Sequence, residues 1–274
     1  MTEMQVTYLN HMGDDLMVAN AARVSFDKQS EWQLRSAGLP DGSLIHKKVL
    51  SQSDVNLINF LARGMQSADF EKFVDGLYHL GKDILIGDFS EKEEAEAVSE
   101  FKKQLWKWRD QPTHWAPFAH PQLSFRIKAP IFVARQLFKH KVGFVDSEVS
   151  RRYIDSDPEF YEPKAWRKRA ANVKQGSSTE TIDDDFLISG HHLYCLNYYK
   201  RLLKEGVCPE QARMVLPQSM MTTWVRTGSL VAWTNMCSQR LDSHAQEEDR
   251  EIILPIYTKL LELFPVSTQA LIHP

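Results

Sequence analysis

The sequence predicts a mixed α/β fold, because strand-like and helix-like segments follow one another along most of the chain. Hydrophobic residues form 43% and charged residues 25% of the 274 residues, an ordinary globular composition that can bury a full core. The length favours one large α/β domain, or one domain that carries an insertion.

Charge, cysteine usage and hydropathy exclude several classes of protein. The formal net charge is −3, whereas a dedicated nucleic-acid-binding protein is normally strongly basic. The three cysteines, Cys195, Cys208 and Cys237, are far apart and lack metal-ligand spacing, so neither disulfides nor a metal site is expected. No signal-peptide pattern and no apolar run of about eighteen residues occurs. We therefore expect a cytoplasmic protein that acts neither on nucleic acid nor at a membrane.

The N-terminal half contains short elements with distinct signals. Residues 4–9 are rich in strand formers, and acidic residues precede the apolar segment 16–24, as is typical of a helix start. Glycine and proline mark the polar stretch 27–53 as an exposed loop. Helical periodicity follows at 55–63 and again from 64 to 110.

The second half begins with a strand at 123–128, whose residues alternate cleanly between polar and apolar. This strand leads directly into an apolar helix, with Pro130 at its first turn. Residues 154–181 are expected to form a long irregular segment. A strong helix follows over 183–205, and Gly206 ends it.

The C-terminal part is predicted to be mainly helical. Pro209 opens a helix at its first turn, whereas residues 218–241 mix strand and helix signals. From about Leu230 the pattern turns helical and continues through Gln246 into the segment 251–254.

Residues 129–153 join the apolar helix to a polar end, with Gly143 as the point where the helix breaks. Cations and hydroxyl groups beside an apolar element are typical of a site for a phosphorylated, partly planar ligand. A solvated basic turn is the alternative interpretation. No GxGxxG, P-loop, HExxH or GxSxG motif is present, which excludes Rossmann, P-loop, zincin and α/β-hydrolase sites.

Four segments, in order along the chain, resemble the flavin-dependent thymidylate synthases (ThyX). They are Ala-Ala-Arg-Val-Ser-Phe at 21–26, Lys-Ala-Pro-Ile-Phe-Val-Ala-Arg-Gln at 128–136, the Lys-His-Lys and Glu-Val-Ser-Arg-Arg-Tyr pair at 139–141 and 148–153, and the Val-Leu-Pro and Gln-Arg-Leu-Asp-Ser-His-Ala-Gln pair at 215–217 and 239–246. The resemblance does not cover 27–53 or a helical insertion at about 64–111.

The resemblance implies an α/β fold of the α+β type: one ThyX-like domain over 1–274, with a central, mostly antiparallel sheet flanked by long helices. It implies reductive methylation of dUMP to dTMP, with methylenetetrahydrofolate as carbon donor, FAD as hydride carrier and NADPH as reductant. Catalysis in the family needs no protein nucleophile, which agrees with the lack of an activated Cys or Ser here. Family members are homotetramers whose sites are shared between subunits.

The resemblance also assigns site residues. Arg240 matches the arginine that stabilises the ionised pyrimidine, so it is the predicted catalytic residue. The dUMP site is predicted to contain Gln136, Lys139, Glu148, Ser150, Arg151, Arg152, Arg213 and Arg240. The FAD site is predicted to contain His114, His120, Lys139, His140, Lys141, Glu148, Ser229 and Asn235. No metal ligand is predicted.

Departures from the family pattern leave other functions open. Lys139 and Lys141 replace arginines and so lose bidentate geometry, while Ser229 and Val231 replace an asparagine and an arginine that help hold FAD. These changes indicate a divergent member, such as a viral one acting in the host cytoplasm. The alternatives are a flavin enzyme whose product is a 5-hydroxymethyl or related pyrimidine nucleotide, and a non-catalytic nucleotide-binding protein.

Overall fold

The computed structural model describes residues 2–38, 44–63, 96, 99, 114–154, 156–170, 177–182 and 188–272. The predicted insertion at 64–111 lies almost entirely outside these residues. The chain divides into two compact units, which are described separately: residues 1–12 with 122–259, and residues 13–121 with 260–274. The single domain expected over 1–274 stays a prediction.

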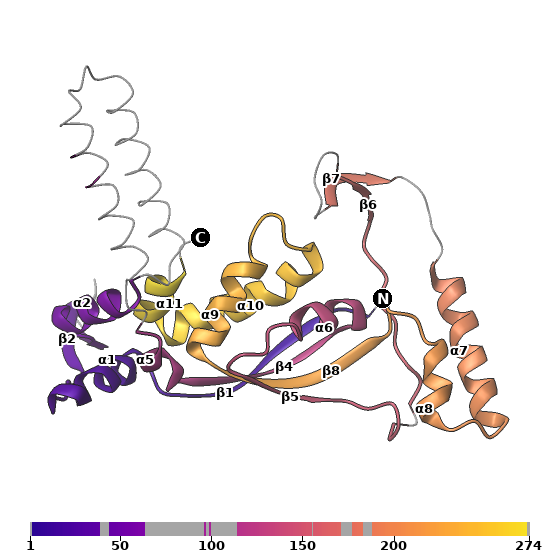
Figure 1. Cartoon of the computed structure of the whole chain (residues 1–274), viewed down its shortest axis with the longest axis horizontal. Helices are drawn as coiled ribbons and strands as arrows, with labels where there is room; N and C mark the ends of the chain where they lie inside the picture. The colour runs from indigo at the N-terminus through magenta and orange to yellow at the C-terminus, as the bar shows by residue number, and fades with distance from the viewer. Residues whose placement is uncertain are drawn as a thin grey trace, which may run out of the picture. The chain divides into compact units, whose positions relative to one another are not determined.

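The first unit is built on a four-stranded antiparallel sheet (Figure 1). Its strands, in spatial order, are β1 (Gln5–Met12), β4 (Gln122–Pro130), β8 (Met221–Ser229) and β5 (Phe144–Glu148). Because β4 and β8 pair over their full lengths, from Gln122 opposite Ser229 to Pro130 opposite Met221, they form the centre of the sheet. The mostly antiparallel sheet expected from the sequence is therefore present.

The helices α6 (Ile131–Leu137) and α9 (Leu230–Arg240) directly follow the two central strands and lie along one face of the sheet (Figure 1). Trp233 of α9 is fully buried, contacts Phe125 edge to face at 5.0 Å between ring centroids, and donates from Nε1 to the Leu123 carbonyl oxygen at 3.1 Å. Buried and less buried residues alternate along β4, and this alternation determines which face of the strand packs against the helix.

The first unit contains further elements outside this core. They are the hairpin β6 (Trp166–Arg169) and β7 (Ser177–Ile182), α7 (Ile188–Lys204), α8 (Pro209–Ala212), the 3-10 turn η2 (Arg213–Val215) and α10 (Glu247–Leu263), whose last residues belong to the second unit. Gly206 follows α7 with a φ of +88°, a conformation that favours glycine, so its predicted role as a helix end is confirmed.

The second unit contains α1 (Asp15–Arg23), the turn η1 (Val24–Phe26), the hairpin β2 (Gln33–Gly38) and β3 (Leu44–Val49), α2 (Gln52–Leu61), α5 (Ala116–Ala119) and α11 (Pro265–Leu271). Asp14 caps α1 by accepting from the Met17 N–H at 2.9 Å, as acidic residues before a helix predict.

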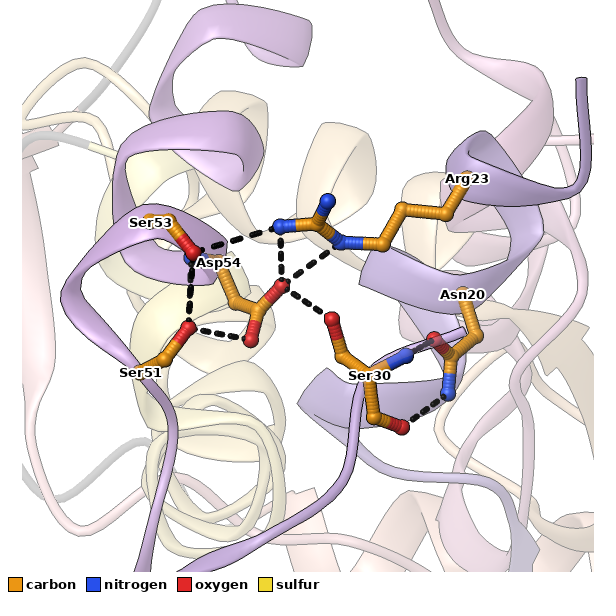
Figure 2. Close-up of polar contacts among 6 residues, drawn as sticks. All are labelled: Asn20, Arg23, Ser30, Ser51, Ser53 and Asp54. Carbon is orange, nitrogen blue, oxygen red and sulfur yellow. Dashed lines mark hydrogen bonds and ion pairs between the residues drawn. The ribbon is translucent and has the colours of Figure 1, made fainter. Parts of the chain in front are cut away.

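Asp54 is the polar centre of the second unit (Figure 2). Its side chain is 1% exposed and accepts from Arg23 Nε at 2.8 Å, from Ser30 Oγ at 2.7 Å and from Ser51 Oγ at 2.5 Å. These donors hold the pKa of the Asp54 carboxyl below its usual value, despite the opposing effect of burial. The arginine of the Ala-Ala-Arg-Val-Ser-Phe segment thus joins α1 to α2.

Three structural predictions made from the sequence were wrong. The described residues of 27–53 are mostly exposed but include the hairpin β2–β3, and most of the hairpin β6–β7 falls within 154–181. Pro130 ends β4 with extended backbone dihedrals and stands before α6, not within its first turn.

The helix expected to continue from Leu230 to Leu254 is also interrupted. Asp242 accepts from the His244 N–H on its side chain at 2.7 Å and from the Ala245 N–H on its carbonyl at 2.9 Å. Such local side-chain bonds compete with the helical pattern, so α9 ends at Arg240 and α10 begins at Glu247. Within the described residues, no helix is both long and apolar enough to cross a membrane.

Candidate active site

Arg240, the predicted catalytic residue, is the last residue of α9. The helix starts at a fixed point because the Ser229 hydroxyl caps it, accepting from the Ala232 N–H at 3.3 Å. It stops where the turn at Asp242 begins. The two ends of α9 together place Arg240 at the side of a polar cavity.

Three acceptors from three parts of the chain hold the Arg240 guanidinium. Nε donates to Nε2 of His140 at 3.0 Å, Nη2 to the Gln136 carbonyl oxygen at 3.3 Å, and Nη1 to Oδ2 of Asp249 at 3.3 Å. An arginine has five N–H groups, so these three contacts with the described residues leave two for a ligand, one on each terminal nitrogen. The side chain is 20% exposed, which keeps it accessible.

His140 is neutral at physiological pH. Burial, helped by the nearby charges of Arg240 and Arg226, lowers the pKa of its imidazole to about 4. Because Nε2 accepts from Arg240, the proton of the neutral ring lies on Nδ1. His140 therefore meets Arg240 as an acceptor without charge repulsion.

Asp249 lies in the first turn of α10 and its side chain is fully buried. Burial raises the pKa of its carboxyl to about 6, against the lowering effect of Arg240. In the described part of the chain, Oδ1 has no hydrogen-bond partner, so Arg240 is the partner that this carboxylate has.

The cavity beside Arg240 has a volume of about 720 Å³. Its lining is polar and comes from α6, the turn after α6, β6, α9, the 241–246 turn and α10: Gln136, Lys139, Arg167, Gln239, Arg240, Asp242, His244, Ala245, Gln246 and Asp249. Cationic donors next to backbone and amide groups suit an anionic, planar heterocycle with carbonyl acceptors.

Four of the other predicted nucleotide residues line a different cavity of the same unit, whereas Arg152 lines neither cavity. This second cavity, of about 510 Å³, contains Glu148, Ser150, Arg151 and Arg213 in its lining. The Glu148 carboxylate accepts from Thr222 Oγ1 at 2.7 Å, and Ser150 Oγ accepts from the nearby Arg152 Nε at 3.2 Å. Within one chain, seven of the eight predicted dUMP residues are thus divided between two cavities.

The predicted flavin residues occupy varied environments. Lys141 is exposed, with Nζ 6.0 Å from the centroid of the Phe138 ring, and Asn235 is an exposed residue of α9. Ser229 is buried as the cap of α9. In the second unit, His114 stacks on Phe60 at 5.9 Å between centroids and His120 is exposed at the end of α5. Their contacts with FAD stay predictions.

The sequence analysis did not predict two residues that lie near the site. Arg226 of β8 is fully buried, and Asp249 begins the stripe of α10 that continues in the buried Ile252, Ile253 and Ile256. In each case, a charged residue occupies a core position of a periodic apolar pattern, and this exception to the pattern was the sequence signal that could have identified it. Among the described residues, no cluster of His, Cys, Asp or Glu could hold a metal ion.

Comparison with known proteins identifies the family. Residues 7–266 match the family model Thy1, described as thymidylate synthase complementing protein. The chain belongs to the Thy1 family. Its members include flavin-dependent enzymes of nucleotide methylation, so FAD is the cofactor that membership implies.

Relatives within the Thy1 family are named flavin-dependent thymidylate synthases. A protein of Thermus thermophilus is 37% identical over 159 residues, which are 57% of this chain and 58% of the relative. The protein of Thermosipho africanus is 37% identical over 164 residues, 57% of this chain and 71% of the relative. The aligned part therefore spans somewhat more than half of the Thermus relative.

Solved structures share the fold. The UMP/dUMP methylase PolB from Streptomyces cacaoi, bound with 5-Br dUMP, superposes with a TM-score of 0.64 at 23% identity, covering 98% of this chain and 94% of PolB. The same enzyme bound with 5-Br UMP gives a TM-score of 0.65 at 22% identity, with the same coverage. The predicted ThyX-like fold, an antiparallel sheet with flanking helices, is confirmed.

Proposed function

We propose that this Thy1 protein catalyses the reductive methylation of dUMP to dTMP. Methylenetetrahydrofolate supplies the carbon and NADPH is the reductant. FAD, when bound, carries the hydride between the co-substrates. The observation that carries the proposal is Arg240, fixed by three acceptors at a polar cavity with two N–H groups left for a ligand.

Arg240 acts on the pyrimidine ring. The methylated carbon of a uracil ring becomes nucleophilic when negative charge develops along the carbonyl and N3 edge, and a guanidinium stabilises that charge. Arginine stays cationic at all working pH values, and its two remaining N–H groups match two adjacent acceptors. Because its three protein contacts already fix its plane, little reorganisation is needed when the charge develops.

The phosphate of dUMP is proposed to bind the cations of the second cavity. Arg151 and Arg213 line it with Ser150, and Arg152 donates to that serine. Guanidinium groups bind phosphate in a bidentate way, so this lining suits a nucleotide monophosphate. The two cavities would then serve one site if they came from different subunits of a homotetramer, as the family resemblance implies.

FAD is proposed to contact the residues that match the family: His140, Lys139, Lys141, Glu148, Ser229, Asn235, His114 and His120. The neutral imidazole of His140 and the ammonium groups of Lys139 and Lys141 supply donors for flavin carbonyl and phosphate oxygens. We further propose that the chain folds as a single domain and acts in the cytoplasm.

One alternative product follows from the lysines at 139 and 141. Lys141 is exposed and lies over the Phe138 ring at 6.0 Å, so it lacks the two-point contacts that an arginine could make. A looser flavin side would favour addition of water, in place of the hydride, to the transferred methylene carbon, which gives a 5-hydroxymethyl nucleotide without consuming NADPH. UMP is a second substrate to test, because the neighbour PolB is described as a UMP/dUMP methylase.

The test is a reaction with the purified, FAD-loaded protein, dUMP or UMP, methylenetetrahydrofolate and NADPH. Oxidised flavin should be visible in the absorption spectrum, and mass spectrometry should show the nucleotide gaining a methyl group. A gain of a hydroxymethyl group would support the alternative product. Colourless protein that cannot be loaded with FAD, or dUMP binding without turnover, would contradict both enzyme functions.

A further inference from the structure

Asp249 is a buried carboxylate that the proposed reaction does not use directly. It lies on α10, outside all four segments that resemble the ThyX family. Its Oδ2 accepts from Nη1 of Arg240 at 3.3 Å, and its side chain is fully buried. The first turn of α10 thus supplies one of the three acceptors that hold the catalytic arginine.

The three acceptors determine the plane of the guanidinium. His140 and the Gln136 carbonyl fix Nε and Nη2, but these two contacts lie towards one edge of the group. Asp249 supplies the contact to the remaining nitrogen, Nη1. Without it, the end of the side chain can rotate between its rotamers, and the two N–H groups left for a ligand lose their direction.

We propose that Asp249 is a positioning residue for the reaction: its carboxylate orients Arg240 so that the free N–H groups of the guanidinium face the pyrimidine edge of dUMP. This inference rests on the proposed function. It also assigns a role to the break between α9 and α10, because the turn at 241–246 brings the start of α10 back to the end of α9.

The electrostatic surroundings agree with this role. The charged and titratable groups around Asp249 are Arg240 and His140 across from it, Glu248 on its own helix, Arg167 bonded to Glu248, and Lys139, Asp242 and His244 along the cavity. Burial and Glu248 raise the pKa of Asp249 to about 6. Protonation below this pH replaces a charge-assisted bond to Nη1 by a weaker neutral one.

Two substitutions separate orientation from mere packing. Asp249→Asn keeps the volume and an oxygen that accepts from Nη1, whereas Asp249→Ala removes the acceptor. We expect Asp249→Ala to lower kcat by about 10–100-fold with a smaller effect on KM, and Asp249→Asn to retain most of kcat. Protonated Asp249 keeps an oxygen acceptor, as Asn does, so wild-type kcat should fall no further than the level of Asp249→Asn as the pH drops through about 6, and Asp249→Asn should lack this small step.

The matched control is Glu180→Gln. This substitution removes an exposed ion pair with Lys168, at 3.0 Å, on the β6–β7 hairpin. The Glu180→Gln variant should keep the wild-type kcat and pH profile. Unchanged kcat in Asp249→Ala would overturn the proposal. Equal losses in Asp249→Ala and Asp249→Asn would also overturn it, because they would show a need for the charge or the fold and not for the oriented acceptor.

A second measurement does not depend on the reaction. Phenylglyoxal labels accessible, mobile arginines, and peptide mass spectrometry can follow Arg240 by itself. Labelling of Arg240 should be faster in Asp249→Ala than in wild type and Asp249→Asn, and equal rates in all three would overturn the proposal. If the wild-type protein converted no dUMP, the proposed function would fail, while the labelling would still decide whether Asp249 holds Arg240.

Discussion

Arg226 and Asp146 form a two-point ion pair between the adjacent strands β8 and β5. Nε and Nη2 of the fully buried Arg226 donate to Oδ1 and Oδ2 of Asp146 at 2.6 and 2.8 Å. Nη1 donates to the Leu137 carbonyl oxygen at 2.9 Å, at the end of α6. The pair therefore ties the edge strand to the segment that leads to His140.

Removing one partner of this pair should strongly destabilise the first unit. Asp146→Asn leaves the buried guanidinium without its counter-charge, and we expect the free energy of unfolding to fall by about 3–5 kcal/mol. Denaturant unfolding of Asp146→Asn and of the exposed-pair control Glu180→Gln checks this, because the control should change by less than about 0.5 kcal/mol. Similar values for both variants would contradict the importance of the pair.

The Arg23–Asp54 contact should be equally important in the second unit (Figure 2). Asp54→Ala leaves Arg23, Ser30 and Ser51 without their shared acceptor, and we expect a loss of about 3 kcal/mol in the free energy of unfolding. The matched control is Asp157→Ala, which removes an exposed pair with Lys200. A thermal midpoint no lower in Asp54→Ala than in this control would contradict the prediction.

The sequence allowed the core of the fold to be predicted where one face is buried. β4 alternates because its inward residues Leu123, Phe125 and Ile127 are buried, with Phe125 against Trp233 of α9, and that alternation is visible in the sequence. The hairpin β2–β3 has no such signal, because its side chains are mostly exposed, including Leu34 at 70% and Ile45 at 50%. A strand without a buried face resembles a polar loop in its sequence.

The sequence predicted only those residues of the candidate site that lie within recognisable motifs. Arg240 was identified through its segment, but its partner Asp249 comes from another helix, and the contact depends on the turn at Asp242. The division of the nucleotide residues between two cavities depends on tertiary structure as well. Glu148 and Gln136 are close in sequence, yet β5 carries Glu148 away from the end of α6.

The pH dependence of stability should reveal the neutral state of His140. Its pKa is about 4 in the folded protein and 6.5 ordinarily, so the unfolded chain binds more protons between these values. The free energy of unfolding should therefore rise as the pH increases from about 4 to 6.5. His140→Gln, whose amide oxygen can still accept from Arg240, should show a smaller rise.

The control for this measurement is His46→Gln, a substitution of an exposed histidine of β3. It should keep the wild-type slope, measured by urea unfolding at a series of pH values. Asp249, with its raised pKa, contributes a slope of opposite sign between about 4 and 6, and because all three proteins contain it, the difference between them isolates His140. Identical slopes in His140→Gln and wild type would show that the pKa of His140 is the same in the folded and the unfolded protein, and would contradict the prediction.

Arg240 itself gives the most direct test of the chemistry. Arg240→Ala should lower kcat by about 10²–10³-fold, because a donor that stabilises developing charge is lost. Arg240→Lys should be closer to Arg240→Ala than to wild type, since one ammonium group cannot contact His140, the Gln136 carbonyl and Asp249 in the plane of the guanidinium. The fold should survive, because the unpaired Asp249 can take up a proton.

Steady-state kinetics and thermal unfolding of each variant test these expectations, with Arg201→Ala, a substitution of an exposed residue of α7, as the control. Near-normal turnover in Arg240→Ala would remove Arg240 from the mechanism and, with it, the reason for its three fixed contacts.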